Sequence, residues 1–517
     1  MPPPAAAVPI APAFTHQQIL QVITGILLCI LLAALDQTVV IPAVPTIAAE
    51  LHAFGHLSWI VSAYLLTSTA ATPVYGKLSD MYGRRALLLV ALALFIAASI
   101  LCALAQSLTQ LIVFRALQGL GGAGLMAMAQ AAIADVVSPR ERGRYQGYMA
   151  GTWGVASVGG PVVGGWVTDH ISWTFVFWIN VPVGLAAMVL CNRALKLLPS
   201  RNMGGKIDYV GAALLTGSVT ALLLVLSWGG SEYEWLSTPI LALLALSAVL
   251  CGLLVWNERR VPDPIMPPRM FREPVFTRGV ILAFAAAVGL LGTTFLLPLY
   301  FQLIRGADAS ASGFLVTPFL LANTIGAYAG GQLSRRIGRT KGIIVGGFGL
   351  SIVGFAALAA AMRPSSPLAV VLVAMGVLGV GIGVCLPNIM VMVQNAAERR
   401  DVGTATGALL FLRTLGGAFG STMVGALLTG VFASRLAAAG YAGTADLGAL
   451  KPGGSLDALG PAAQLAGRTA LSAGFTLAFG ACLALFAAAL LVTLGLRDIP
   501  LRTVAGSAPE EAGSLGH

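Results

Sequence analysis

The sequence Gly76-Lys-Leu-Ser-Asp-Met-Tyr-Gly-Arg84 occurs a second time, in altered form, as Gly331-Gln-Leu-Ser-Arg-Arg-Ile-Gly-Arg339. Five of the nine positions are identical, and each copy lies between two long apolar runs. A loop that returns between corresponding apolar segments indicates that the chain contains two related halves. The apolar runs around these two loops therefore decide the class of fold.

The apolar runs are long enough to cross a lipid bilayer. Hydrophobic residues make up 57% of the 517 residues and charged residues only 10%, whereas soluble domains carry about 25% charged residues. A spanning helix needs about 20 mostly apolar residues. Such runs lie at 19–42, 57–75, 86–106, 108–136, 145–167, 175–195, 209–228, 237–256, 279–303, 312–333, 342–362, 368–393, 403–432 and 470–496. The sequence therefore predicts an all-α integral membrane protein with fourteen transmembrane helices.

The charges in the loops indicate which side of the membrane each loop faces, because cytoplasmic loops collect Lys and Arg. When the runs are threaded through a bilayer, 23 of the 30 Lys and Arg residues fall on one side and five on the other. The other two, Arg115 and Arg413, lie within runs. We therefore expect a multi-pass protein of the plasma (inner) membrane with both termini in the cytoplasm. Basic residues scattered over short loops argue against nucleic-acid binding.

The repeated loop also suggests a domain organisation. If the seventh and eighth runs are an insertion, each copy of the loop joins the second and third helices of a six-helix bundle. The predicted order is a disordered cytoplasmic tail at 1–18, an N-terminal six-helix bundle at 19–200, two inserted helices at 201–260, a cytoplasmic linker at 261–277, a C-terminal six-helix bundle at 278–496 and a cytoplasmic tail at 497–517. A flexible external loop is expected at 434–469, where it could dock a periplasmic adaptor protein.

Motifs for catalysis and metal binding are missing from the sequence. GxSxG, a Walker loop and HExxH are all absent, and the six cysteines lie in apolar runs without a CxxC pair. We expect no enzyme activity, no disulfide, no metal and no cofactor. Without a nucleotide site, an ion gradient must supply the energy for any transport. A proton gradient is favoured over sodium, because one lone carboxylate is a poor sodium cage.

Several motifs resemble those of one transporter family. GKLSDMYGRR (76–85) resembles the loop motif of the major facilitator superfamily, and LIVFRALQGLGGAG (111–124) resembles its fourth-helix motif. GGPVVGGW (159–166) is similar to the Gly-Pro motif of its antiporters. The fourteen-helix drug:proton antiporter branch is resembled by LDQTVVIPAVPTI (35–47), FVFWINVPVG (175–184), LPLYFQLIRGADASASG (297–313) and VQNAAERRDVGTATGALLFLRTLGGAFG (393–420).

The resemblance covers about residues 19–496 and implies a fold and a mechanism. The expected fold is two six-helix bundles with two helices inserted between them, and the expected mechanism is a rocking alternation of access around a central cavity. The chain departs from the family pattern at Ile41, where Asn is frequent, and at Thr174, where Arg is common. The second loop copy also has Arg335 where the first has Asp80.

Asp36 and Arg115 are the candidates for proton coupling. Asp36 is an acidic residue well inside an apolar run, and an ionisable group there usually faces a cavity or a partner. Helical rise places Asp36 about 13 Å and Arg115 about 10 Å from the outer ends of their helices, so the two charges share a layer. We expect protonation of Asp36 to weaken its hold on Arg115 or on a cationic substrate. The alternative is a static structural ion pair.

Two glycine-rich motifs are expected to move or pack helices. The resemblance implies that the first loop copy is a gate that stabilises the outward-open state, through Gly76, Asp80, Gly83 and Arg84. The alternative is that its arginines only set topology. The resemblance also implies export for the motif in the fifth run, which consists of Gly159, Gly160, Pro161, Gly164 and Gly165. The alternative is a generic packing face of small residues.

Polar and aromatic residues within the apolar runs are candidates for lining a substrate cavity. These are Gln37, Tyr64, Gln118, Trp153, Gln302, Asn323, Asn388, Gln394 and Arg413. Each alone could instead form a hydrogen bond between helices.

The sequence thus predicts a proton-coupled antiporter that exports small lipophilic or cationic drugs or toxic compounds. Its expected partners are a lipophilic small molecule, protons and the lipid bilayer. The first alternative is a dedicated exporter of one natural product or siderophore. A proton-coupled importer disagrees with the Gly-Pro motif, and a receptor or scaffold leaves the charged pair inside the bilayer unexplained.

Overall fold

The computed structural model describes residues 16–51, 58–197, 207–230, 232–363, 365–441 and 461–502, and this part of the chain is almost entirely helical. The first group of helices comprises α1 (His16–Glu50), α2 (Ser58–Tyr82), α3 (Arg84–Ala103), α4 (Leu108–Val136), α5 (Pro139–His170), α6 (Phe175–Trp178) and α7 (Asn180–Ala194). Two helices follow, α8 (Tyr209–Trp228) and α9 (Thr238–Glu258). The last group comprises α10 (Pro274–Leu303), α11 (Ala309–Ile337), α12 (Lys341–Ala361), α13 (Leu368–Ala396), α14 (Val402–Ala438) and α16 (Pro461–Leu494).

The prediction of an all-α membrane protein with fourteen helices is confirmed, with α6 and α7 counted as one segment. Within the described ranges, 12 helices are long and apolar enough to span a membrane by length and composition. The other two, α2 and α5, are also long enough, at 25 and 32 residues, but contain more small and polar residues. Both lie where the two groups of helices meet, which favours small residues over bulky apolar ones.

The helix ends differ from the predicted runs mainly outside the apolar core. The helix α1 continues past Pro42 and Pro45 to Glu50. The helix α14 continues to Ala438 and α16 begins at Pro461, so both ends of the loop expected at 434–469 are helical. Alanine-rich sequence favours a helix whether or not it is inside the membrane. The linker expected at 261–277 ends earlier, because α10 begins at Pro274, a residue suited to a first helical turn.

Some of the expected segments lie outside the described residues. These are residues 1–15 and 503–517 of the two expected tails and residues 442–460 of the expected external loop.

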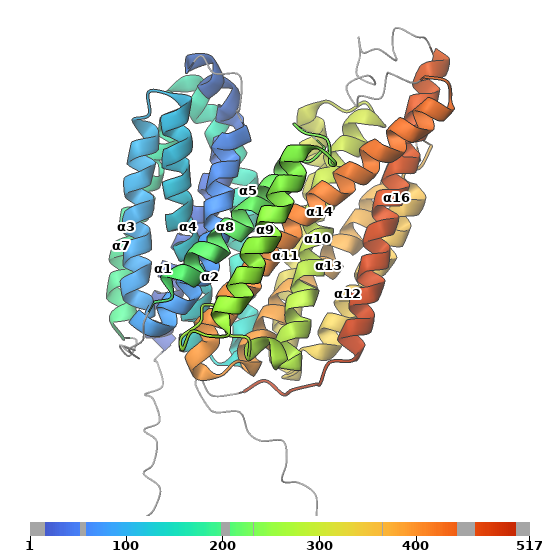
Figure 1. Ribbon diagram of the computed structural model, residues 1–517. Helices are drawn as coiled ribbons and strands as arrows, with labels where there is room; N and C mark the ends of the chain where they lie inside the picture. The colour runs from blue at the N-terminus through green and yellow to red at the C-terminus, as the bar shows by residue number, and fades with distance from the viewer. Residues whose placement is uncertain are drawn as a thin grey trace, which may run out of the picture.

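The helices form two groups with a pair of helices beside them. Figure 1 shows α1–α7 on the left and α10–α16 on the right, with the C-terminal end of α16 at the bottom. Each group has its own apolar core, one around Phe95 and Leu125 and the other around Phe348, Phe355 and Phe479. The arrangement leaves the long axes of the helices roughly parallel, as the hydrophobic thickness of a bilayer requires.

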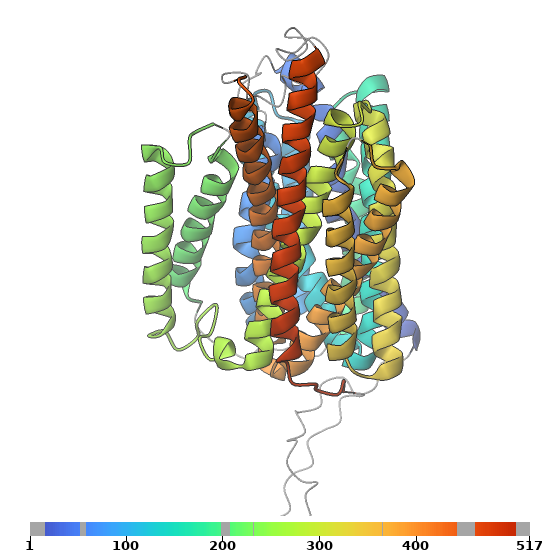
Figure 2. The ribbon, with the colours of Figure 1, turned by 90° about the vertical axis from the view of Figure 1, so that its right-hand side faces the viewer.

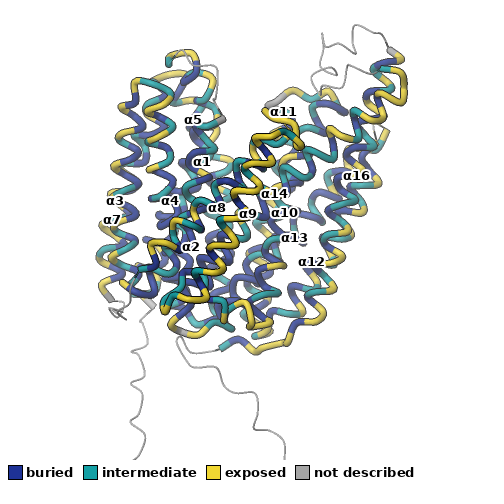
Figure 3. Tube along the Cα trace, viewed as in Figure 1, coloured by how far each residue is buried: buried dark blue, intermediate teal, exposed yellow. Residues whose placement is uncertain are grey.

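The helices α8 and α9 stand beside the two groups, as Figure 2 shows. One face of α8 packs against α2 and α14 through a cluster that includes Leu66, Leu223 and Phe411. The Thr422 hydroxyl of α14 donates a hydrogen bond to the Leu226 carbonyl of α8, at 2.9 Å. The helix α9 packs on α8 and is exposed along most of its length (Figure 3). This pair therefore covers one seam between the two groups.

The two groups approach each other most closely at the lower end of Figure 1 and diverge toward the upper end. A Cβ atom on Gly76 of α2 would lie 2.6 Å from the Gly403 carbonyl oxygen of α14. On the opposite seam, a Cβ atom on Gly331 of α11 would clash with the Gly143 carbonyl of α5. Only glycine permits such close approach of two backbones. The two glycines that begin the repeated loops therefore let the two groups touch.

Candidate functional site

The helices α1 and α4 bring Asp36 and Arg115 together. The Arg115 Nη1 atom lies 2.7 Å from Asp36 Oδ2, and both side chains are almost fully enclosed, at 0% and 1% exposure. The two charges thus lie close together, as the sequence predicts. An ionic group transferred into an apolar interior costs several kcal/mol unless it is paired and hydrogen-bonded. The site therefore depends on its remaining partners.

The other partners of this pair are polar side chains from α4 and α7. Asp36 Oδ1 accepts hydrogen bonds from Gln118 Nε2 and Asn180 Nδ2, each at 2.8 Å. Arg115 Nη1 also donates to Gln118 Oε1 at 2.6 Å, and Arg115 Nε donates to the Ile60 carbonyl at 3.0 Å. The carboxylate thus faces only donors, which is the arrangement that stabilises its ionised form.

Aromatic and hydroxyl groups complete the enclosure. The Arg115 guanidinium lies 4.6 Å from the centre of the Tyr64 ring and 5.8 Å from that of Phe177. The Ser99 hydroxyl on α3 accepts a hydrogen bond from Gln118 at 2.7 Å. Tyr64 and Gln118, which the sequence suggested as cavity liners, are both buried in this cluster. The cluster thus holds one carboxylate beside one guanidinium, and the guanidinium stays charged at any biological pH.

Sequence reasoning missed Asn180 and Ser99. Both are buried and both belong to the hydrogen-bonded cluster around Asp36. Asn180 lies within FVFWINVPVG, a stretch singled out only for its resemblance to the antiporter branch. The sequence offered only a weak signal, an amide within an apolar run, because such amides commonly form hydrogen bonds between helices.

The first loop copy binds the start of α14. Asp80 accepts hydrogen bonds from the backbone N–H groups of Gly403 and Thr404, at 3.0 and 2.7 Å, and from the Thr404 hydroxyl at 2.8 Å. Arg84 donates to Asp80 at 2.7 Å and to Asp135 at 3.0 Å. The first N–H groups of a helix lack partners within the helix and carry partial positive charge, so a carboxylate satisfies both needs. Asp80 therefore joins one helix group to the other.

Gly83 explains the sharp turn between α2 and α3. Its φ angle is 88°, in the region that favours glycine, and it is followed directly by Arg84 at the start of α3. The turn aims the Arg84 side chain back toward Asp80 at the end of α2. Gly76, Asp80 and Arg84 thus lie against the start of α14, and Gly83 provides the turn that positions Arg84.

The second loop copy makes the corresponding contact with the opposite charge. Arg335 of α11 forms an ion pair with Glu141 of α5 at 2.7 Å. The corresponding residue of the first copy, Asp80, instead binds the N-terminus of α14. Both side chains are more than a third exposed, whereas Asp80 is 4% exposed. The departure at Arg335 is therefore matched by an acidic residue at the start of α5, and this contact is the weaker of the two.

The glycine motif of α5 faces α1, the helix that carries Asp36. Cβ atoms on Gly160 and Gly164 would clash with Thr38 and with the Val39 carbonyl, respectively. The Thr38 hydroxyl also donates to the Ala156 carbonyl at 2.9 Å. Gly159 has no such neighbour within 4 Å, and Gly165 meets only Pro42, at 3.9 Å. Two of the four glycines are thus needed for close packing within two to three residues of Asp36; Pro161, between them, is exposed.

The remaining cavity candidates are dispersed over both groups. Gln302, Asn323, Asn388 and Gln394 donate hydrogen bonds within the second group, to Ser312, Gly379, Val384 and Thr406, respectively. Gln394 also donates to the Gln130 carbonyl of α4 in the first group, at 3.4 Å. The acceptor atoms Asn388 Oδ1 and Gln394 Oε1 are buried without a partner. Gln37, Trp153 and Arg413 are partly exposed. Among the described residues, Arg413 has no hydrogen-bond or ion-pair partner.

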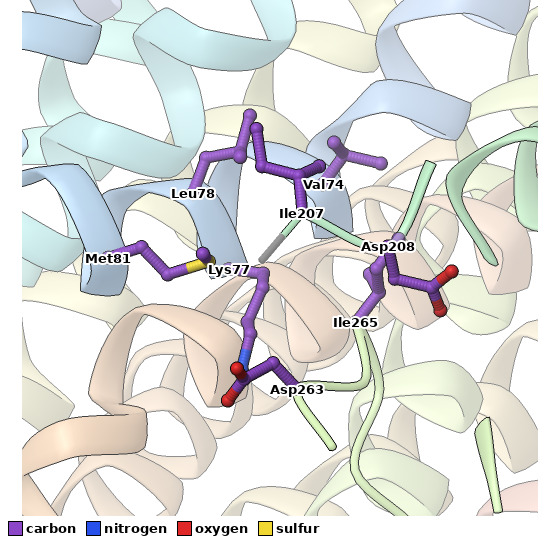
Figure 4. A pocket seen from close by; sticks show the side chains of 8 residues that line it. All are labelled: Val74, Lys77, Leu78, Met81, Ile207, Asp208, Asp263 and Ile265. Carbon is purple, nitrogen blue, oxygen red and sulfur yellow. The ribbon is translucent and has the colours of Figure 1, made fainter. Parts of the chain in front are cut away.

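A small pocket lies at the lower end of α2, away from this site. Figure 4 shows the Lys77 side chain of α2 pointing toward Asp263, which follows α9, whereas the carboxylate of Asp208, which precedes α8, points away from it. The cavity volume is about 10 Å³, far below the roughly 300–1,000 Å³ typical of ligand sites. It marks the place where the connections of α8 and α9 meet the first loop copy.

The connection after α9 also reaches the start of α14. Arg269 forms an ion pair with Asp401 at 2.9 Å, directly before the first residue of α14. Burial raises the pKa of the Asp401 carboxyl, and the adjacent Arg269 opposes that rise. The linker is therefore fastened to the same helix end that Asp80 binds.

Comparisons with known proteins agree on one family. The sequence profile of the Major Facilitator Superfamily matches residues 26–421. An uncharacterized MFS-type transporter of Mycobacterium tuberculosis is 36% identical over 495 residues, which cover 96% of this chain and 72% of the relative. The multidrug transporter protein MdtP of Bacillus subtilis is 37% identical over 408 residues, covering 78% and 74%.

Solved structures agree on the fold. The human organic anion transporter MFSD10 aligns over 90% of this chain and 99% of its own, with a TM-score of 0.59 and 16% identity. At that identity the likeness concerns the fold alone. Taken with the profile and the close relatives, it leads to one assignment: the chain belongs to the major facilitator superfamily, a family of multi-pass membrane transporters.

Proposed function

We propose that this protein is a proton-coupled antiporter of the fourteen-helix drug:proton branch, and that it exports lipophilic drug-like molecules. The observation that carries the proposal is the buried pair of Asp36 and Arg115, joined at 2.7 Å. A carboxylate that faces only donors can be neutralised by a single proton, and the loss of its charge weakens its hold on Arg115. Two relatives named as multidrug proteins of Bacillus subtilis support the substrate class.

The orientation of the protein in the membrane is the next part of the proposal. In this proposal, the end bearing the repeated loops faces the cytoplasm, as the arginines of those loops favour. Both termini then lie in the cytoplasm, and the membrane is the plasma (inner) membrane. The hydrogen bonds of Asp80 to the start of α14 support a gate that is closed at that end. The proposal also includes the predicted division into two six-helix bundles with the inserted pair of helices at 201–260.

Protonation and substrate binding alternate in this mechanism. With Asp36 ionised, the Arg115 pair is intact and the site is ready to receive a proton from the outside. With Asp36 protonated, Arg115 is released from its partner, and the strengthened positive charge nearby disfavours a cationic substrate. Return to the other state releases the proton into the cytoplasm and restores the site. The cavity candidates with free acceptor atoms, Asn388 and Gln394, are proposed to contact polar groups of the substrate.

The test is proton release driven by substrate in inverted membrane vesicles. A panel of lipophilic cations and neutral drugs is added to vesicles that hold an acid interior, and a dye reports loss of the gradient. We expect at least one compound to dissipate the gradient with the wild-type protein and none to do so with Asp36→Asn. Asp169→Asn is the matched control, because Asp169 is an exposed acidic residue at the outer end of α5.

Each outcome has a clear meaning. If Asp36→Asn responds as wild type does, the proton site lies elsewhere and the pair is structural. If no compound acts on wild type while the protein is present and folded, the exporter is dedicated to one substrate outside the panel.

A further inference from the structure

The hydrogen bonds around Asp36 pose a problem for any proton that binds there. Asp36 receives three side-chain donors, from Arg115, Gln118 and Asn180. An ionised carboxylate only accepts hydrogen bonds, so it suits this shell. A protonated carboxyl carries an O–H group that must itself donate. Unless one of the three partners offers an acceptor, that buried O–H is left without one, at a cost typical of unsatisfied polar groups.

The partners differ in their ability to become an acceptor. Arg115 has donors only and cannot accept a hydrogen bond. Gln118 is held at both ends of its amide, since its Oε1 accepts from Arg115 at 2.6 Å and its Nε2 also donates to Ser99 at 2.7 Å. Turning Gln118 would break both of these bonds. Asn180 is different, because its Oδ1 atom is buried without a hydrogen-bond partner.

Asn180 is therefore the partner that can turn at least cost. Its Nδ2 atom donates to Asp36 at 2.8 Å and makes only a long contact of 3.4 Å with Ser99. A half-turn of the amide exchanges Nδ2 for Oδ1 and presents an acceptor to the carboxyl. The charged and ionisable groups facing Asp36 are Arg115 from α4, Tyr64 from α2 and Cys102 from α3. None of them needs to move for this exchange.

We propose that Asn180 is a positioning residue for the proton site, which turns its side-chain amide when Asp36 is protonated and accepts the hydrogen bond of the new O–H group. The proton goes onto Asp36 Oδ1, the oxygen that Asn180 contacts, and not onto Oδ2, which pairs with Arg115 in this structure. This inference rests on the proposed function, because it requires Asp36 to be the proton acceptor. It adds a residue that distinguishes the two protonation states.

The position of Asn180 in the chain makes the turn consequential. Asn180 is the first residue of α7, directly after the break that separates α6 from α7 at Ile179. Phe177 of α6 lies two residues before this break, and its ring is 5.8 Å from the Arg115 guanidinium. A change in the hydrogen bond of Asn180 therefore acts at the junction of α6 and α7, which lies beside Arg115.

The experiment is infrared difference spectroscopy of the full-length protein in liposomes, recorded as the buffer is acidified. Three samples are compared: unlabelled protein, protein with ¹³C in the side-chain carbonyl of asparagine, and protein with ¹³C in that of glutamine. We expect a carboxylic acid band from protonated Asp36, together with a side-chain amide band that moves with the asparagine label and not with the glutamine label. Both changes should vanish in Asp36→Asn.

Two variants locate the amide. In Asn180→Leu, which has a similar volume and no polar atoms, the amide band should disappear while the carboxylic acid band remains. In Ser99→Ala, which removes a hydroxyl that Asn180 barely contacts, the amide band should persist. Size-exclusion profiles and melting temperatures report whether each variant is folded, and the labelled wild-type samples test the inference even if Asn180→Leu is not.

The outcomes separate this inference from the proposed function. A carboxylic acid band that Asp36→Asn removes, with an amide change that follows the glutamine label, assigns the turn to Gln118 and overturns the inference alone. The inference is also overturned if the amide band that follows the asparagine label persists in Asn180→Leu. If acidification gives no band that depends on Asp36, the proposed proton site fails, and the role of Asn180 fails with it.

Discussion

At the scale of single residues, the pair of Asp36 and Arg115 is a buried ion pair whose members need each other. Both are enclosed, and each is hydrogen-bonded to Gln118 as well as to the other. A buried pair of this kind contributes little net stability compared with an apolar pair, because removing two charges from water costs about as much as their attraction returns. Removing one member is different, since it leaves the other charge buried and alone.

This reasoning predicts an asymmetric mutational cycle. Arg115→Leu leaves the Asp36 carboxylate without its counter-ion and should destabilise the protein by about 3–5 kcal/mol at neutral pH. The double variant Asp36→Leu with Arg115→Leu should recover most of that loss, and under the proposed function it should not exchange substrate for protons. Unfolding in mixed micelles, followed by tryptophan fluorescence, measures both. Additive losses in the double variant would show that the two charges are not energetically coupled.

The same two residues show how far the sequence can predict a site. Asp36 and Arg115 stand out because a charge within an apolar run is costly and therefore rare. Asn180 does not stand out, because amides in membrane helices are common and most form hydrogen bonds between helices. Its partner Asp36 is 144 positions away in the chain. Only the packing of α1 against α7 brings the two together, and no local pattern encodes that pairing.

At the scale of helices, the contact of α5 with α1 depends on which glycines face the partner. Gly164 lies against the Val39 backbone, whereas Gly159, five residues earlier in the same motif, faces open space. A glycine that touches a neighbouring backbone cannot accept a methyl group unless the helices separate. A glycine in open space only weakens its helix, by about 1 kcal/mol relative to alanine.

Two alanine substitutions in one motif should therefore have opposite effects. Gly164→Ala should separate α5 from α1 near Asp36 and lower both the melting temperature and the rate of substrate-driven proton release. Gly159→Ala should leave transport unchanged and stabilise the protein by up to about 1 kcal/mol. Melting curves in detergent and the vesicle assay compare the pair directly. Equal loss in both variants would mean that the motif acts through helix flexibility and not through close packing.

The start of a helix was predictable where an N-cap residue directly precedes an apolar run. The predicted runs 108–136 and 209–228 coincide with α4 and α8, which begin after Ser107 and Asp208. Both side chains accept a hydrogen bond from the first turn, as N-cap residues do. The end of α14 lies six residues beyond its predicted run, because its alanine-rich extension continues the helix without further need of apolar residues.

At the scale of the whole molecule, both loop copies contact the other helix group at the same end, beside further contacts such as the hydrogen bond from Gln394 to the Gln130 carbonyl. Asp80 accepts three hydrogen bonds from the start of α14 and is buried. On the other seam, Glu141 and Arg335 form an exposed ion pair. Charge-assisted hydrogen bonds in a buried setting contribute about 1.5–3 kcal/mol, and an exposed ion pair contributes at most about 1 kcal/mol. The two related loops are therefore unequal, and the first should control the balance between the two states of the transporter.

This inequality can be measured as a change in the distance between the outer ends of the two groups. Spin labels at Gln106, between α3 and α4, and at Ser365, between α12 and α13, report that distance once the exposed Cys251 is replaced by serine. Asp80→Asn removes the charge and offers a donor where the helix start needs an acceptor, so the population with the outer ends close together should rise about tenfold or more. Glu141→Gln should change that population by less than about fivefold, because its ion pair is exposed to solvent. Equal shifts in both variants, or none with Asp80→Asn, would mean that the apolar packing of α8 across the seam, and not the cap on α14, holds this end closed.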